Sequence, residues 1–264
     1  MSLLLRDELR IKLSPEMVAM VRRGRGLNSE VVARHAVACT AAAHDATPWA
    51  SMLDSLEKGL STVESEKSDA LVVLSNHFVR YALVPWSELI SDQDEVQAFI
   101  RQCFTRIYGA DAQNWALRVS HGGYGETQVA SAIDQGLLDE LERVVVAHGM
   151  KLVSLQPYFM TIFNQWRHRM QGSVVWFVVA ETGRLCISQL RQGSWQSLRT
   201  LKVGDDWQVA LKNLLEREFL ISESGTERGS VYLYAPGLAV ETDIPGWPVH
   251  QLRAFLDPVP QAGS

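Results

Sequence analysis

Two apolar runs meet at a glycine-containing turn in the stretch SVVWFVVAETGRLCISQL, which runs from Ser173 to Leu190. The turn residues Glu181-Thr182-Gly183 predict a β-hairpin. Glycine in such a turn lets backbone N–H groups approach a phosphate, and a carboxylate beside it can organise Mg²⁺ and water. A hairpin of this kind holds phosphate in one large class of ATP-binding proteins, so the stretch raises the question of whether this one does.

A second glycine-rich stretch, HGGYGE at residues 121–126, does not fit a phosphate loop. It lacks the trailing Lys-Ser/Thr, and the sequence predicts a strand after it, whereas a phosphate loop leads into a helix. We interpret its glycines as those of an ordinary loop.

The other residue types that do chemistry are scattered along the chain. No G-x-S-x-G elbow is present, and the histidines show neither H-x-x-x-H nor H-E-x-x-H spacing. Three cysteines stand far apart in apolar stretches, so neither a disulfide framework nor a thiolate metal site is indicated, and a reducing compartment fits. We predict no catalytic residue and no metal site among these positions, which are His35, His44, His77, His121, His148, His168, His250, Cys39, Cys103 and Cys186.

Charge and hydropathy argue against two classes of partner. The chain has 264 residues and a formal net charge of −5, and its one compact basic run is MVRRGRG, from Met20 to Gly26. Binding to nucleic acid or to anionic lipid needs clustered Lys and Arg, so we predict no nucleic-acid partner. The sequence shows neither a signal peptide nor an 18-residue apolar span, so we expect no direct membrane insertion and a membrane contact only through a partner.

The predicted elements repeat. Three strands, a helix and an apolar strand are expected over residues 9–75 and again over 173–235. In the first set, residues 70–76 are expected to form a strand buried on both faces, with residues 77–86 as its partner strand. After Gly237 we expect an irregular tail, held to the body by Trp247, Leu252 and Phe255.

Helix boundaries are clearest between the two sets. Asp92 is a candidate N-cap for a helix that stops at Gly109, and residues 115–120 predict a strand. Asp134 is a candidate cap for a second helix, which stops at Gly149 and is followed by a short strand. Pro157 then predicts the start of a further helix.

The duplicated unit is the layout of the actin-like, ribonuclease-H-like superfamily. The segment Thr127–Trp166 resembles the crossover of the type IV pilus assembly protein PilM and its relatives, the MshI proteins and the cytoplasmic domain of the type II secretion protein GspL. In that family a small-residue strand, a helix, a Gly-hydrophobic stop, a short strand and an x-Pro-aromatic helix start follow one another. The corresponding runs here are VASAI, LLDELERVVVAHG, MKLVSL and QPYF, and RTLKVGDDW (Arg199–Trp207) is similar to the family's strand-to-helix passage.

The resemblance covers about residues 9–237 and implies where a nucleotide would bind. In nucleotide-binding members an Asp on the first strand and a Gly-Ser-type turn position Mg²⁺ and the phosphates. A second Asp-x-Gly hairpin opens the second half, and a paired-glycine loop follows the late buried strand. This sequence departs from the pattern at all three places, at the degenerate phosphate-loop positions Lys12, Ser14, Pro15, Ala180, Glu181, Gly183, Pro236 and Gly237.

Each departure weakens nucleotide binding. Lys12 replaces a carboxylate and would repel Mg²⁺, and Pro15 removes a backbone donor. Ala180 stands near the expected Asp of the second hairpin, and Pro236 stands beside the glycine of the third loop. We therefore predict no bound cofactor and a purely structural turn at Glu181-Thr182-Gly183.

The predicted fold is α/β, with two ribonuclease-H-like lobes of mixed sheets and helices and a cleft between them. The expected division is residues 1–168 for the first lobe with its crossover helices, 169–237 for the second lobe, and 238–264 for a proline-containing tail. The resemblance implies a non-enzymatic cytoplasmic scaffold of a type IV pilus or type II secretion inner-membrane platform. Such a scaffold would bind the cytoplasmic tail of a bitopic inner-membrane protein, or an assembly ATPase, and would reach the inner membrane through that partner. The alternative is a divergent actin-like ATPase or small-molecule kinase that uses ATP and Mg²⁺.

Overall fold

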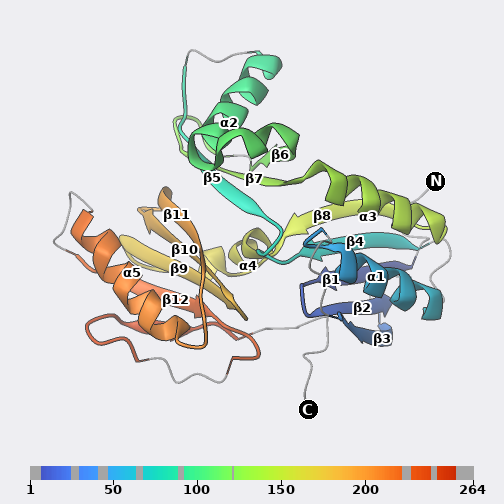
Figure 1. The fold of residues 1–264 in the computed structure, drawn as a ribbon. Helices are drawn as coiled ribbons and strands as arrows, with labels where there is room; N and C mark the ends of the chain where they lie inside the picture. The colour runs from blue at the N-terminus through green and yellow to red at the C-terminus, as the bar shows by residue number, and fades with distance from the viewer. Residues whose placement is uncertain are drawn as a thin grey trace. The chain divides into compact units, whose positions relative to one another are not determined.

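A computed structural model of the chain describes residues 7–24, 30–40, 47–63, 68–88, 92–120, 122–221, 227–238 and 243–253. These residues form an α/β protein with two five-stranded sheets and one three-stranded sheet (Figure 1). They fall into two compact units. The first contains the described residues up to Val79 together with Ile133–Thr161, and the second contains Arg80–Ala132 and the described residues from Ile162 onward. Both units are discontinuous in sequence, whereas the expected lobes were contiguous, and the expected boundaries stay a prediction.

The first unit is built on a five-stranded sheet with the order β3-β2-β1-β4-β8. Strands β1, β2 and β3 are antiparallel neighbours, and β4 and β8 run parallel to β1. Helix α1 (Ala50–Thr62) contacts β2 and β3, and α3 (Gln135–Ala147) contacts β8 and α1. The strands are β1 (Glu8–Leu13), β2 (Met17–Arg23), β3 (Val31–Ala38), β4 (Asp69–Leu74) and β8 (Lys151–Pro157).

The second unit repeats this arrangement in the order β11-β10-β9-β12-β13. Strand β10 is antiparallel to both β9 and β11, and β12 and β13 run parallel to β9. The predicted duplication of three strands, a helix and a strand is therefore confirmed, with a fifth parallel strand added to each sheet. The elements are β9 (Val174–Glu181), β10 (Arg184–Arg191), β11 (Ser194–Lys202), α5 (Trp207–Ile221), β12 (Ser230–Tyr234) and β13 (Val249–Gln251).

A smaller sheet, in the order β5-β7-β6, lies between the two repeats in the sequence. Its helix α2 begins after Asp92 and ends before Gly109, as expected from the sequence. Helix α4 begins directly after Pro157, also as expected. These elements are β5 (Arg80–Val84), α2 (Gln93–Tyr108), the 3-10 helix η2 (Gly109–Asn114), β6 (Trp115–Val119), β7 (Gln128–Asp134), α4 (Tyr158–Trp166) and the 3-10 helix η3 (Arg167–Arg169).

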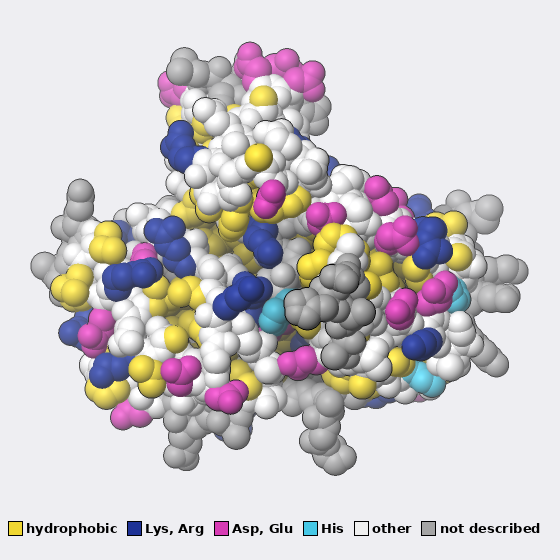
Figure 2. All heavy atoms as spheres, viewed as in Figure 1, with side chains coloured by type: hydrophobic (Ala, Val, Ile, Leu, Met, Phe, Trp, Pro, Cys, Tyr) yellow, Lys and Arg dark blue, Asp and Glu magenta, His cyan; other side chains and the backbone are white. Residues whose placement is uncertain are grey.

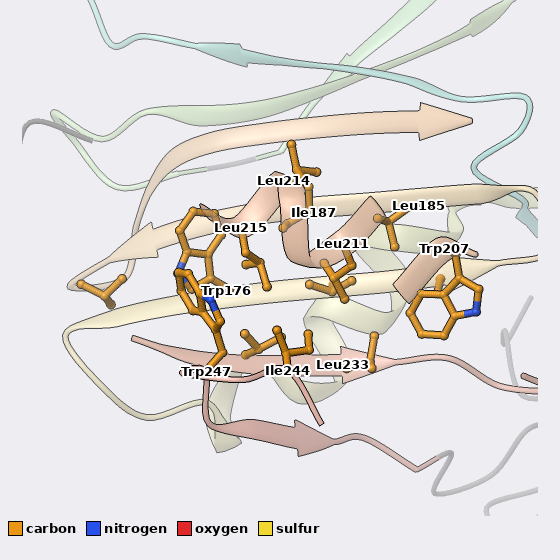
Figure 3. Close-up of a cluster of buried hydrophobic side chains, with 14 residues drawn as sticks. Trp176, Leu185, Ile187, Trp207, Leu211, Leu214, Leu215, Leu233, Ile244 and Trp247 are labelled. Carbon is orange, nitrogen blue, oxygen red and sulfur yellow. The ribbon is translucent and has the colours of Figure 1, made fainter. Parts of the chain in front are cut away.

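The core of the second five-stranded sheet is a cluster of apolar side chains beneath α5 (Figure 3). Leu211 and Leu215 of α5 face Trp176 and Leu233 of the sheet, and all four are almost fully buried. The rings of Trp176 and Trp247 pack at nearly a right angle, with their centroids 5.7 Å apart. Burial of this much apolar surface is the main free-energy source for the lobe.

Three expectations about single strands were wrong. Residues of β4 alternate between buried and half-buried, so the apolar run is fully covered on one face only. Strand β5 pairs with β7 instead of β4, because the partner is chosen by long-range packing that local alternation does not reveal. The tail is not wholly irregular, because β13 adds to β12, and Leu252 donates its N–H to the Leu233 carbonyl at 2.7 Å. Trp247 is buried as expected, whereas Phe255 lies outside the described residues.

Candidate functional site

The first group of candidate positions lies at the carboxyl end of β1. Because β1, β4 and β8 are parallel, the residues that follow them meet at one edge of the sheet. The turn from β1 to β2 is closed by its own groups. The Ser14 hydroxyl donates to the Met17 carbonyl at 2.9 Å and accepts from the Met17 N–H at 3.1 Å. Pro15 supplies no N–H, so the turn has little left with which to hold a phosphate.

Lys12 is held by an aromatic ring within the same unit. Its ammonium nitrogen lies 4.1 Å from the centroid of Tyr158, the first residue of α4. Tyr158 is buried, so the contact combines a half-buried cation with the face of an aromatic ring. A cation fixed at this position disfavours a divalent metal ion nearby.

Asn76 is a residue at this edge that the sequence did not single out. It is fully buried, and its side-chain oxygen accepts a hydrogen bond from the Phe159 N–H at 3.1 Å, in the first turn of α4. Beside it, the Ser75 hydroxyl lies 3.0 Å from Nδ1 of His77. Asn76 therefore serves as the acceptor that a helix start requires. The available signal was a polar Ser-Asn pair directly after an apolar strand.

The second group lies at the β9–β10 turn, where the hairpin forms as predicted. Glu181 pairs with Arg184, which leaves Thr182 and Gly183 as the two turn residues, and Gly183 has a positive φ of 73°. Ala180 is 1% exposed and belongs to the apolar cluster beneath α5. A carboxylate in place of its methyl group would enter an apolar environment, where an unpaired charge is costly.

The third group follows β12. Because β12 is parallel to β9, the Pro236-Gly237 turn is at the same edge of the sheet as Thr182-Gly183. The Leu238 N–H returns to the Ala235 carbonyl at 3.4 Å, and the Leu238 side chain packs on the apolar cluster. The turn is thus stabilised by packing from its own unit.

Ionisable groups near the β9–β10 hairpin have shifted pKa values. Burial, and then the positive charge of Arg80, lower the pKa of Arg184. Nε of Arg184 is buried and has no hydrogen-bond partner among the described residues. Burial raises the pKa of the Cys186 thiol to about 12, so this cysteine is unreactive near neutral pH.

The groups present do not fit Mg-ATP. Among the described residues, no group of three or more His, Cys, Asp or Glu side chains is placed to hold a metal ion. Lys12 lies on Tyr158 and Ala180 lies in the core, so the two positions that would carry carboxylates offer none. On the face drawn in Figure 2, cationic and anionic side chains are interspersed, and neither sign forms a continuous surface.

No helix within the described part of the chain is both long enough and apolar enough to span a membrane.

Neither the known protein families nor the curated proteins contain a match to this sequence. Solved structures do match, and they define the class of fold. A protein of Bacteroides thetaiotaomicron with an actin-like ATPase fold and unknown function is 10% identical with a TM-score of 0.57, over 90% of this chain and 84% of that chain. The described chain therefore has an actin-like fold with two ribonuclease-H-like lobes.

Two further structures match the expected branch of this fold. The cytoplasmic domain of EpsL, an inner-membrane component of the type II secretion system of Vibrio cholerae, is 13% identical with a TM-score of 0.59, over 94% of this chain and 90% of that chain. The PilM-PilN type IV pilus biogenesis complex contains a chain that is 15% identical with a TM-score of 0.62, over 94% of this chain and 88% of that chain. The predicted resemblance to PilM and GspL is confirmed at the level of the fold.

Proposed function

We propose that this chain is a non-enzymatic, actin-like scaffold of a type IV pilus or type II secretion inner-membrane platform. In this role it binds the cytoplasmic tail of a bitopic inner-membrane protein, and it works in the cytoplasm at the inner membrane through that partner. An assembly ATPase is a second partner consistent with the same role. The similarity in fold to EpsL and to the PilM-PilN complex supports the proposal.

The observation that carries the non-enzymatic part is the state of the phosphate turns. Lys12 has its ammonium group on the Tyr158 ring, and Ala180 fills part of an apolar cluster. Phosphoryl transfer depends on metal ions and on positioned charges around the phosphates, and these positions supply neither.

A short cytoplasmic tail can bind a protein of this fold without the help of any catalytic group. An extended peptide gains affinity from main-chain hydrogen bonds and from a few apolar pockets for alternate side chains. The membrane protein then supplies the anchor, and the scaffold supplies the docking surface on the cytoplasmic side. Binding of the tail in this way requires no nucleotide.

The test is chemical cross-linking of the tagged chain to native inner membranes, followed by purification. The proposal expects recovery of a single-span protein with a short cytoplasmic N-terminus. A synthetic peptide with that N-terminal sequence should then bind the purified chain in a titration, and a scrambled peptide of equal composition should not. Recovery of soluble metabolic enzymes alone would contradict the proposal.

A further inference from the structure

The outermost parallel strands of the two five-stranded sheets differ in how they are held. Strand β8 has seven residues and leads directly into α4. Strand β13 has three residues and lies in the segment of residues 243–253, which we call the strap. Among the described residues no helix or strand follows β13, so the strap could leave the sheet without interrupting another described element.

The backbone of the strap is bonded to one strand, β12. The Val231 N–H of that region donates to the Pro248 carbonyl at 2.8 Å, and the Leu252 N–H donates to the Leu233 carbonyl at 2.7 Å. Bonded positions alternate along a strand, so the backbone groups of His250, midway between these two bonds, also face β12. Because all of these bonds join the same two strands, they break together when the strap leaves.

Two side chains fasten the strap to the core. Ile244 and Trp247 are 2% and 3% exposed and belong to the apolar cluster beneath α5 (Figure 3). The Trp247 ring meets the rings of Trp176 and Phe219 at nearly right angles. The other residues of the strap are exposed or half-buried. The free energy that holds the strap closed therefore comes mainly from these two side chains and the short ladder.

The two tryptophans of this contact are held differently. Nε1 of Trp176 donates to the Arg228 carbonyl at 2.8 Å. Nε1 of Trp247 is buried and has no hydrogen-bond partner among the described residues. The guanidinium group of Arg228 lies 5.4 Å from the centroid of the Trp247 ring. Burial of an indole N–H without a partner costs free energy, so it offsets part of the gain from burying the Trp247 ring.

The rest of the second sheet is held more strongly than the strap. Strand β10 is paired along its whole length with β9 on one side and β11 on the other. Segments of a folded chain open with different free energies, and those with few backbone bonds and few buried side chains open first. The strap is the part of this sheet that meets both conditions.

We propose that residues 243–253 form a detachable strap, which opens as one unit while α5 and strands β9 to β12 stay folded. Opening uncovers the outer backbone edge of β12 and the place of the Trp247 ring in the cluster. The uncovered site accepts the same segment when it is supplied in trans, by strand addition with Ile and Trp as its apolar anchors. The closed strap is thus an autoinhibitory contact, and the proposal does not depend on the scaffold role.

Opening is measured by amide hydrogen exchange of the full chain, read residue by residue by NMR. The amides of Val231 and Leu252 are bonded across the junction with the strap, so they should share one opening equilibrium. After correction for intrinsic rates, both should exchange at least about tenfold faster than the amide of Ile187 in β10. Exchange of all three amides through the same global unfolding would overturn the proposal.

Variants distinguish loss of the strap from loss of the core. Trp247→Ala should speed exchange at Val231 by at least about a hundredfold, with a smaller change at Ile187. Trp207→Ala makes the same substitution at the opposite end of the cluster (Figure 3), so it should not accelerate Val231 selectively. His250→Pro removes a backbone donor but no core side chain, and it should act as Trp247→Ala does. Equal acceleration at Val231 and Ile187 in both strap variants would contradict the proposal.

A peptide tests whether the uncovered site binds in trans. The probe is acetyl-Asp-Ile-Pro-Gly-Trp-Pro-Val-His-Gln-Leu-Arg-amide, which has the sequence of the strap, and its control has Ala in place of Trp. At millimolar concentration the probe should slow exchange at Val231 in the Trp247→Ala chain, and the control peptide should not. The natural chain should bind the probe at least about tenfold more weakly, because its own strap competes. Absence of protection in the variant, or equal binding to both chains, would show that no such site is uncovered.

Discussion

The ammonium group of Lys12 on β1 lies 4.1 Å from the centre of the Tyr158 ring at the start of α4. In nucleotide-binding actin-like proteins, the residue expected at this place on the first strand is a carboxylate that serves the metal. Here the position joins two elements of one unit by a contact between a cation and an aromatic ring. The role that the structure gives Lys12 is a structural one.

That contact predicts a measurable loss of stability. Lys12→Met keeps the aliphatic stem and removes the charge, so we expect the free energy of unfolding to fall by about 1 kcal/mol. Lys12→Arg keeps a cation over the ring and should cost less. Urea unfolding of the three proteins makes the comparison, and equal stability of Lys12→Met and the natural chain would show that the contact contributes nothing.

Two glycines with similar backbone angles should respond differently to alanine. Gly229 and Gly237 have φ values of 75° and 77°, so alanine is strained at both. A Cβ at Gly229 would also lie 2.5 Å from the Val174 carbonyl oxygen, whereas a Cβ at Gly237 meets nothing within 4 Å.

We expect Gly237→Ala to cost about 1–2 kcal/mol from backbone strain alone. Gly229→Ala should cost more than about 3 kcal/mol or yield insoluble protein, because the backbone of β9 would have to move. Melting temperatures and soluble yield of the pair provide the measurement. Equal losses at the two positions would mean that β9 and β12 are not as close as described.

Asn76 should be required for the start of α4. Asn76→Ala removes the acceptor for the buried Phe159 N–H, so the free energy of unfolding should fall by about 1–3 kcal/mol. Asn76→Ser keeps a short side-chain oxygen that can accept the bond without burying a charge and is the matched control. If the alanine variant unfolds at the same urea concentration as the natural chain, the bond is not part of the folded state.

Cys186 makes stability depend on pH in the alkaline range. Burial raises its pKa from the model-peptide value of 9.0 to about 12, so above pH 9 the thiol ionises in the unfolded chain before it does in the folded one. The unfolded state then binds fewer protons, and the stability that the thiol contributes is lost as the pH rises from about 9 toward 12.

The measurement compares the free energy of unfolding of the natural chain with that of Cys186→Ala at a series of pH values. Below pH 8 the gap in free energy of unfolding between the two proteins should be constant. Above pH 9 the natural chain should lose stability relative to the variant by up to about 1.4 kcal/mol per pH unit. A gap that stays constant to pH 11 would show that the thiol is accessible to water in the folded chain.

The local elements were predictable where strong periodicity met clear boundary residues. The hairpin of β9 and β10 formed about the turn that its glycine indicated. Asp134 caps α3 through a 2.8 Å bond from the Gly136 N–H, and Gly109 ends α2. In each case residues close in sequence carry the information.

Long-range relationships could not be predicted in this way. Strand β5 pairs with β7, whose residues come much later in the chain, and nothing in the alternation of β5 specifies that partner. Strand β13 is three residues long and follows Pro248, so it shows no usable period. The bond from the Phe159 N–H to Asn76 likewise depends on the parallel arrangement of β4 and β8.

The candidate positions themselves were identifiable by their place in the duplicated pattern, but their surroundings were not. The family resemblance predicted that Lys12 replaces one carboxylate and that Ala180 stands near the place of another. It did not show that Lys12 contacts Tyr158 or that Ala180 belongs to the cluster beneath α5. Both contacts are made by residues distant in sequence, so they follow from the fold and not from the local pattern.

The most direct measurement is thermal unfolding in the presence of Mg-ATP at several millimolar. A ligand at 100 times its dissociation constant adds about 2.7 kcal/mol to the stability of the form that binds it, which would raise the melting temperature of a chain of this size by about 5–10 °C. Our account predicts a melting temperature that is unchanged from the control with magnesium alone. A rise that saturates with ATP concentration and requires Mg²⁺ would contradict it and favour an actin-like ATPase or small-molecule kinase.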